Sequence, residues 1–93
     1  MSYKYFGTLL HNVEDKVWEV KFDDFPEAMT FGETPVEAYK YGKDVLILAL
    51  DGRKNFPKPT EFKKHIDFNS SEYDEAFQLP FEVTKAEIES IVK

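Results

Sequence analysis

The chain has 93 residues and a mass of 10.9 kDa, which suits one domain with one small core, and its 42% hydrophobic content is too high for a disordered chain. It contains no cysteine, so a disulfide framework and any cysteine-based zinc or redox site are excluded. Its 18 acidic residues outnumber its 12 basic ones, and the net charge of -6 is the reverse of what nucleic-acid binders usually show and would attract a basic partner.

Two strands are predicted at the start of the chain. Residues 3–10 are rich in aromatic residues, Thr and Leu, and residues 16–22 alternate between apolar and charged side chains. A connection as short as residues 12–15 forces the two strands to be antiparallel. The alternation predicts one buried and one solvated face, with Trp18, Val20 and Phe22 on the first and Glu19 and Lys21 on the second.

A turn and a short third strand should follow the hairpin. Pro26 restricts Phe25 to an extended conformation and prevents the second strand from continuing, so we expect a turn over residues 23–27. Residues 28–31 are then predicted to form the third strand.

The next segment carries the strongest signals for a helix. Thr34 is a good N-cap, Pro35 suits the first helical position, and Glu37 follows the cap by three residues to complete a capping box. Gly52 can adopt the left-handed conformation that ends many helices. A helix over residues 35–51 is predicted.

The predicted helix has an unusually wide apolar surface. A stripe of small side chains should face the sheet, and larger apolar side chains flank it on both sides. We expect the remaining apolar surface of the helix to be covered, either by a partner molecule or by the C-terminal segment. The stripe comprises Ala38, Gly42, Val45 and Ala49, and the flanks comprise Tyr39, Leu46 and Leu50 on one side and Tyr41 and Leu48 on the other.

The C-terminal third is less regular. Residues 52–60 contain two prolines and should form an extended connector, while residues 61–78 are mostly polar and fit no single element. A short strand is expected over residues 79–83 or, alternatively, over residues 64–68. Thr84 and Glu87 form a second capping box before a short helix, whose apolar positions are Ile88, Ile91 and Val92.

The sequence offers no pattern for catalysis. The two histidines lie in different elements without metal-ligand spacing, and the glycines form no phosphate-binding loop. Paired carboxylates in residues 23–37 could hold Mg²⁺, but the turn and the positive helix N-terminus explain them better. No stretch is long and apolar enough to span a membrane, and the N-terminus lacks the layout of a signal peptide, so a cytoplasmic, non-enzymatic protein without metal or cofactor is expected.

The order of these features resembles the HicB-like antitoxins across about residues 3–60. Members of that family share an aromatic strand, a proline turn, a Gly-Asp/Glu-Thr helix start followed by Glu-Ala, and a Pro-x-Pro after the helix. The matching residues here are Tyr5, Trp18, Phe25-Pro26, Gly32-Glu33-Thr34, Glu37-Ala38 and Pro57-Lys58-Pro59.

The resemblance implies an α+β fold with strand order βββαβ along the chain, related to a degraded RNase H-like core and to double-stranded-RNA-binding folds. One long helix would pack on an antiparallel sheet of three to four strands, with a short C-terminal helix after it. The whole chain would be a single HicB-like domain, with residues 61–93 as a C-terminal extension.

The resemblance also implies a function, which is to neutralise a small, basic, RNA-cleaving HicA toxin by covering it. Many family members carry a C-terminal DNA-binding module, for which the residues after Val83 are too few, so direct DNA binding is not expected. We further expect the protein to form homo-oligomers through the leftover helix surface or an edge strand. The partner-binding residues predicted from charge and aromaticity are Asp23, Asp24, Glu27, Glu33, Tyr5 and Phe25.

The alternative is an RNA-binding module of double-stranded-RNA-binding-like fold without catalysis. Tyr3, Tyr5 and Phe6 could stack on bases if they are exposed, although Arg53 is the chain's single arginine.

Overall fold

A four-stranded antiparallel sheet with one long helix packed on it forms the body of the protein in a computed structural model that describes residues 2–90. The strand order β3-β2-β1-β4 and the α+β class confirm the predicted fold. The elements are β1 (Ser2–Asn12), β2 (Val17–Phe22), β3 (Phe25–Gly32), α1 (Pro35–Leu50), β4 (Tyr73–Thr84) and α2 (Lys85–Ser90).

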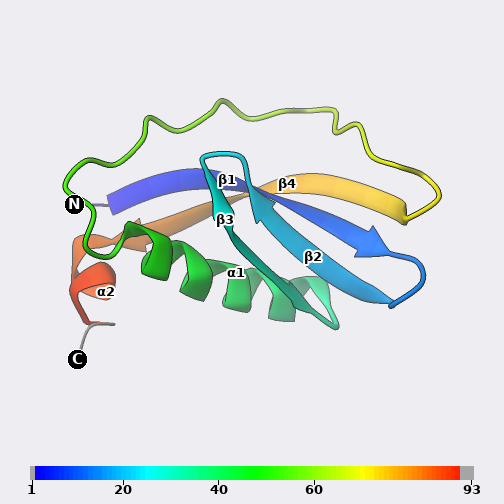
Figure 1. Ribbon diagram of the computed structural model, residues 1–93, viewed down its shortest axis with the longest axis horizontal. Coiled ribbons are helices and arrows are strands. Elements are labelled where there is room, and N and C mark those ends of the chain that lie inside the picture. The colour runs from blue at the N-terminus through cyan, green and yellow to red at the C-terminus, as the bar shows by residue number, and fades with distance from the viewer. Residues whose placement is uncertain (1, 91–93) are drawn as a thin grey trace.

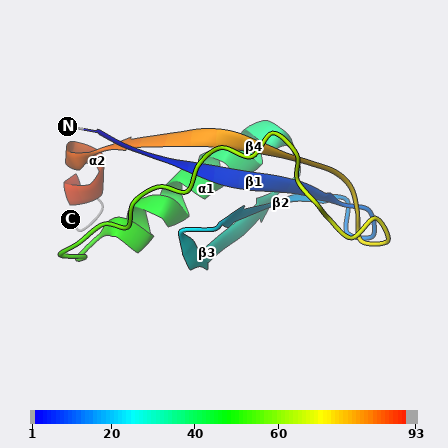
Figure 2. The same cartoon turned by 90° about the horizontal axis from the view of Figure 1, so that it is seen from above.

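The sheet separates two layers of different character. Helix α1 lies on one face, and the long connector of residues 51–72 runs across the other, as Figures 1 and 2 show. The connector therefore covers part of the face that the alternation in β2 predicted to be solvated. No helix within residues 2–90 is both long enough and apolar enough to cross a membrane.

Helix α1 begins where the local signals place it. The Thr34 hydroxyl accepts a hydrogen bond from the Glu37 N–H at 3.1 Å, and the Glu37 carboxylate accepts one from the Glu33 N–H at 3.0 Å. The reciprocal bond thus reaches one residue further back than in a standard capping box. The helix ends at Leu50, one residue before the predicted end, and Gly52 has the expected left-handed φ of 78°.

The helix face that meets the sheet is rotated from the predicted stripe. Ala38 and Gly42 are buried as predicted, but the next contacts are made by Leu46 and Leu50, which continue the spacing of four residues. Val45 and Ala49 are only partly buried. Because Gly42 lacks a side chain, the ring of Phe81 can approach the helix so closely that a Cβ on Gly42 would lie 2.8 Å from it.

Both outer strands are longer than predicted, and each contains a proline. The turn occupies only residues 23–24, so the expectation that it extends to residue 27 is wrong and β3 already begins at Phe25. The strand expected over residues 79–83 lies inside β4, which is longer, covers Tyr73–Thr84 and pairs along the length of β1, whereas the alternative placement over residues 64–68 is wrong. Pro26 and Pro80 fit because each lies in an edge strand, where half of the N–H groups need no partner in the sheet.

The second capping box forms as predicted. The Thr84 hydroxyl accepts from the Glu87 N–H at 3.1 Å, and the Glu87 carboxylate accepts from the Thr84 N–H at 2.9 Å. An ion pair of 2.8 Å joins Glu87 to Lys43 of α1, and Ile88 is buried. Helix α2 therefore docks on α1; Ile91 and Val92 lie outside the described residues.

Candidate functional site

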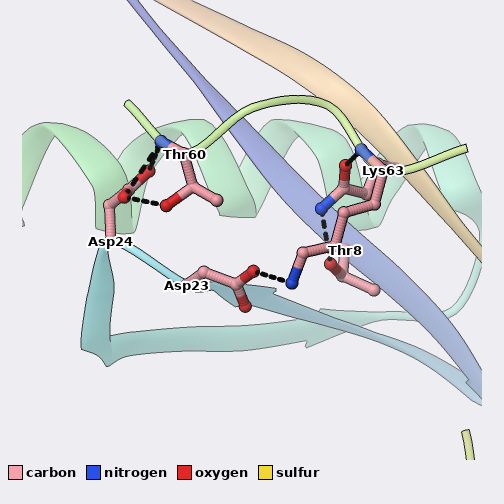
Figure 3. Close-up of polar contacts among 6 residues, drawn as sticks. Thr8, Asp23, Asp24, Thr60 and Lys63 are labelled. Carbon is pink, nitrogen blue, oxygen red and sulfur yellow. Dashed lines mark hydrogen bonds and ion pairs between the residues drawn. The ribbon is translucent and has the colours of Figure 1, made fainter. Parts of the chain in front are cut away.

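The predicted acidic cluster turns out to hold the connector in place. The Thr60 N–H donates to both carboxylate oxygens of Asp24, at 3.1 and 3.0 Å, and the Thr60 hydroxyl donates to Asp24 Oδ1 at 2.6 Å. Beside it, Lys63 Nζ forms an ion pair of 2.8 Å with Asp23, which raises the pKa of the Lys63 ammonium. Figure 3 shows both contacts between the β2–β3 turn and the connector.

Glu27 serves the same purpose at the other end of the connector. Arg53 Nη2 lies 2.8 Å from the Glu27 carboxylate, and Arg53 Nε donates to the carbonyl oxygen of Ala49 in the last turn of α1. A hydrogen bond from the Glu27 backbone and the nearby guanidinium together lower the pKa of the Glu27 carboxyl. Three of the four predicted partner-binding carboxylates are thus already engaged, and Glu33 is the one of these four whose carboxylate has no ion pair or hydrogen bond among residues 2–90.

The two predicted aromatic contacts lie in the core. Tyr5 and Phe25 are 1% and 0% exposed and pack edge to face with ring centroids 4.9 Å apart, so the expectation that they reach a partner at the surface is wrong. The Tyr5 hydroxyl donates to the carbonyl oxygen of Pro57 at 2.7 Å, and burial raises the pKa of this phenol. Tyr3 and Phe6, also considered for stacking on bases, are partly buried against connector rings.

The connector closes over one half of the outer sheet face. The Lys63 N–H donates to the Gln78 side-chain oxygen at 2.6 Å, and the Gln78 amide donates to Thr8 at 3.4 Å, which ties the connector to β4 and β1 (Figure 3). Further along, the Tyr73 hydroxyl donates to Glu19 at 2.9 Å. Burial is the main cause that raises the pKa of Tyr73.

The other half of the outer face stays open and carries the candidate site. Met29 and Phe31 project from alternate positions of β3 and are 56% and 62% exposed. Together with Val17 they line a shallow hollow of about 420 Å³, whose rim includes Asp15 and Glu19. We call this surface, comprising Asp15, Val17, Glu19, Met29, Thr30 and Phe31, the β2–β3 patch.

Sequence reasoning missed the apolar centre of this patch. The predicted strand over residues 28–31 includes Met29 and Phe31, and their alternation with Ala28 and Thr30 is a usable signal for two faces. That signal could not say which of the two faces the helix would cover. The structure puts Ala28 toward the core, where it is 5% exposed, and Met29 outside.

The histidines and carboxylates do not gather into a reactive centre in the described part of the chain. His11 Nδ1 lies 2.7 Å from Asp74, and its ring packs on Trp18 with centroids 4.8 Å apart, whereas His65 is in the connector. Among residues 2–90, no three side chains of His, Asp or Glu are placed to hold a metal ion together. The open surface has an apolar centre and a polar rim, a composition that protein interfaces commonly share.

No family model matches the chain, and a search of curated proteins gives no match.

Proposed function

We propose that this chain is a non-enzymatic, antitoxin-like protein that binds and neutralises a small, basic, RNA-cleaving toxin of the HicA type. The single observation that best supports this is the β2–β3 patch, where Met29 and Phe31 are exposed on a rigid sheet beside carboxylates. Exposed aromatic and Met side chains in the centre of a patch are typical of protein interfaces. The motif order that resembles HicB-like antitoxins points to the same class of partner.

The charge of this surface indicates that the partner should be basic. The carboxylates of Asp15 and Glu33 form no hydrogen bond or ion pair within residues 2–90, so they are available to cations of another molecule. A toxin that cleaves RNA needs cationic side chains to hold the phosphate backbone. Those side chains would meet the carboxylates of Asp15 and Glu33 instead, and the bound protein would block access of RNA to the toxin.

This placement differs from the one expected from sequence. Asp23, Asp24 and Glu27 face connector residues and contribute to the negative field of the surface without being free to pair with a partner. Asp15 and Glu33 take over the role that those three residues were expected to play. The aromatic contact is made by Phe31 in place of Tyr5 and Phe25.

The test inspects the genes adjacent to this chain's gene for a small, basic HicA-type toxin and then measures RNA cleavage by the purified toxin. We expect the protein to abolish cleavage at about equimolar concentration, and the double variant Asp15→Lys, Glu33→Lys to inhibit at least tenfold less well. The matched control is Glu61→Lys, Asp67→Lys, which changes the net charge by the same amount at two exposed connector positions.

The outcomes of this assay test both the antitoxin proposal and the location of the site. Unhindered cleavage at excess protein would overturn the antitoxin proposal. Equal inhibition by both double variants would overturn the location of the site. A parallel titration with RNA alone addresses the RNA-binding alternative, because real phosphate contacts weaken steeply with added salt.

A further inference from the structure

The outer edge of β3 is an unpaired strand that lies between two apolar surfaces. β3 ends the strand order β3-β2-β1-β4, and the connector contacts the turn that precedes it and, through Arg53, Phe25 and Glu27 in the first half of the strand. On the helix side, Val45 and Leu48 of α1 share a hollow of about 260 Å³ with Ala28 and Met29 of β3. The leftover helix surface and the free strand edge, which the sequence suggested as separate features, are therefore contiguous.

Exposed large apolar side chains are concentrated at this edge. Eight large apolar side chains are exposed among residues 2–90, and four of them lie on β3 or on the adjoining stripe of α1. Met29 and Phe31 stand on the outer side of the strand, at 56% and 62% exposure, and Tyr41 and Leu48 on the helix side, at 41% and 59%. We call these four side chains the β3 edge surface. Large contiguous apolar surfaces of this kind mark interaction sites in monomeric proteins.

The protection of this edge against strand pairing is confined to its start, where Pro26 lies and where the pairing with β2 has a bulge. Natural edge strands are commonly blunted by proline, by bulges, by lysine or by inward-pointing charges. The eight residues Phe25–Gly32 contain one charged side chain, Glu27, and Arg53 of the same chain already neutralises it. A second strand can therefore approach without leaving an unpaired charge at the contact.

We propose that the occupant is a second copy of this chain, which pairs its own β3 antiparallel to the first around a two-fold axis. A strand paired with itself in this way presents the same surface from both sides, as a two-fold dimer requires. With the axis near Thr30, Met29 of one copy lies opposite Phe31 of the other, and the contact occurs twice. Such Met–aromatic and cross-strand pairs are favourable.

The charges beside the helix stripe fit a second copy better than a strongly basic protein. Lys40 and Asp44 are exposed on the solvent side of α1 and carry one charge of each sign. The chain carries a net charge of -6, but the edge itself is close to neutral, so two copies meet there with little repulsion. The dimer joins two sheets into one of eight strands and leaves the hollow of the β2–β3 patch on its outer face. This inference goes beyond the proposed function and does not depend on it.

The test measures the mass of the protein in solution by sedimentation equilibrium from about 1 μM to about 1 mM, a range that covers weak and strong dimers. We expect a dimer, and we expect Met29→Lys and Leu48→Lys each to weaken it at least tenfold. Val36→Lys is the matched control, because Val36 is an 81% exposed apolar side chain at the start of the same helix and away from the β3 edge. Far-UV circular dichroism confirms that each variant is folded.

Hydrogen exchange gives a second measurement that does not depend on variants. In the dimer, outward-facing amides of β3 are protected, and the protection falls on dilution. A protein that stays monomeric at about 1 mM, or a dimer that Val36→Lys weakens as much as Leu48→Lys, would overturn the proposal. A monomer that nevertheless inhibits the toxin would overturn the dimer and leave the proposed function standing.

Discussion

Asp24, in the turn between β2 and β3, accepts three hydrogen bonds from Thr60, two from the backbone N–H at 3.0 and 3.1 Å and one from the hydroxyl at 2.6 Å. The two residues are 36 positions apart in sequence. With the ion pairs of Asp23 to Lys63 and Glu27 to Arg53, this contact fixes the path of a connector that has no helix or strand of its own. The acidic turn therefore holds the connector in place, which is a structural role within the chain.

The first prediction concerns the contact of Asp24 with Thr60. Asp24→Ala removes all three bonds, and since hydrogen bonds to a charged group contribute about 1.5–3 kcal/mol when well shielded, we expect a loss of about 1 kcal/mol at this partly exposed site. The Thr60 amide should exchange with solvent much faster in the variant. Amide hydrogen exchange by NMR measures this, and Glu61→Ala, whose side chain makes no such bond, is the control. An unchanged Thr60 exchange rate would contradict the contact.

The second prediction compares two glycines. A Cβ on Gly32 would lie 2.5 Å from the backbone nitrogen of Ala38, whereas a Cβ on Gly42 would lie 2.8 Å from a ring carbon of Phe81, which can shift. Overpacking costs about 1–3 kcal/mol or more, but in a helix alanine regains about 1 kcal/mol over glycine. We therefore expect Gly32→Ala to destabilise the protein by about 3 kcal/mol and Gly42→Ala by about 1 kcal/mol.

Urea unfolding at one fixed protein concentration measures both values. Gly52→Ala serves as a reference for backbone strain alone, because Gly52 has a φ of 78° and open space around its Cβ position. If Gly42→Ala proved more damaging than Gly32→Ala, the close approach of β3 to the first turn of α1 would be refuted.

Local signals in the sequence account for the parts of the fold that were predicted well. Thr34, Pro35 and Glu37 define the start of α1 through contacts within a few residues, and the predicted start is correct. The predicted end differs from the observed one by one residue. The prediction over residues 79–83 covers only part of β4, because the length of this strand depends on pairing with β1, which lies more than 60 residues away in sequence. Its polar residues and Pro80 obscure the strand pattern, although an edge strand tolerates both.

The candidate site was less predictable for a similar reason. The sequence shows that Asp23, Asp24 and Glu27 are close together, but it does not show that the connector returns to them 26 to 40 residues later. Likewise, alternation in β2 and β3 predicts two faces and leaves open which part of the outer face the connector covers. The path of the connector in the folded protein decides which charged and apolar side chains remain accessible to a partner.

The third prediction concerns acid stability. Lys43 lowers the pKa of Glu87 below its ordinary value of 4.5, so the folded state binds the Glu87 proton less well than the unfolded state does. The stabilisation is therefore complete above the unfolded pKa and disappears as the pH falls through the lower, folded value. We expect Glu87→Gln to reduce the loss of stability below about pH 4.5.

Thermal unfolding followed from neutral pH down to about pH 3 measures this slope. Glu61→Gln, at an exposed carboxylate without an ion pair, is the control and should leave the slope as it is. Equal slopes for the wild type and Glu87→Gln would contradict the contribution of the Lys43 pair.

The fourth prediction separates charges that steer a partner from charges that hold the fold. If the partner is a basic toxin, Asp15→Lys combined with Glu33→Lys should slow association by about tenfold at low salt, because steering by complementary charge acts mainly on the association rate. The difference should shrink as salt shortens the screening length from about 30 Å at 0.01 M to about 8 Å at 0.15 M. Asp24→Lys combined with Glu33→Lys changes the net charge equally but also releases Thr60, so it should lower stability in addition. Stopped-flow association and urea unfolding of both variants distinguish the two effects, and association rates that do not respond to charge at low salt would rule out electrostatic capture of the toxin.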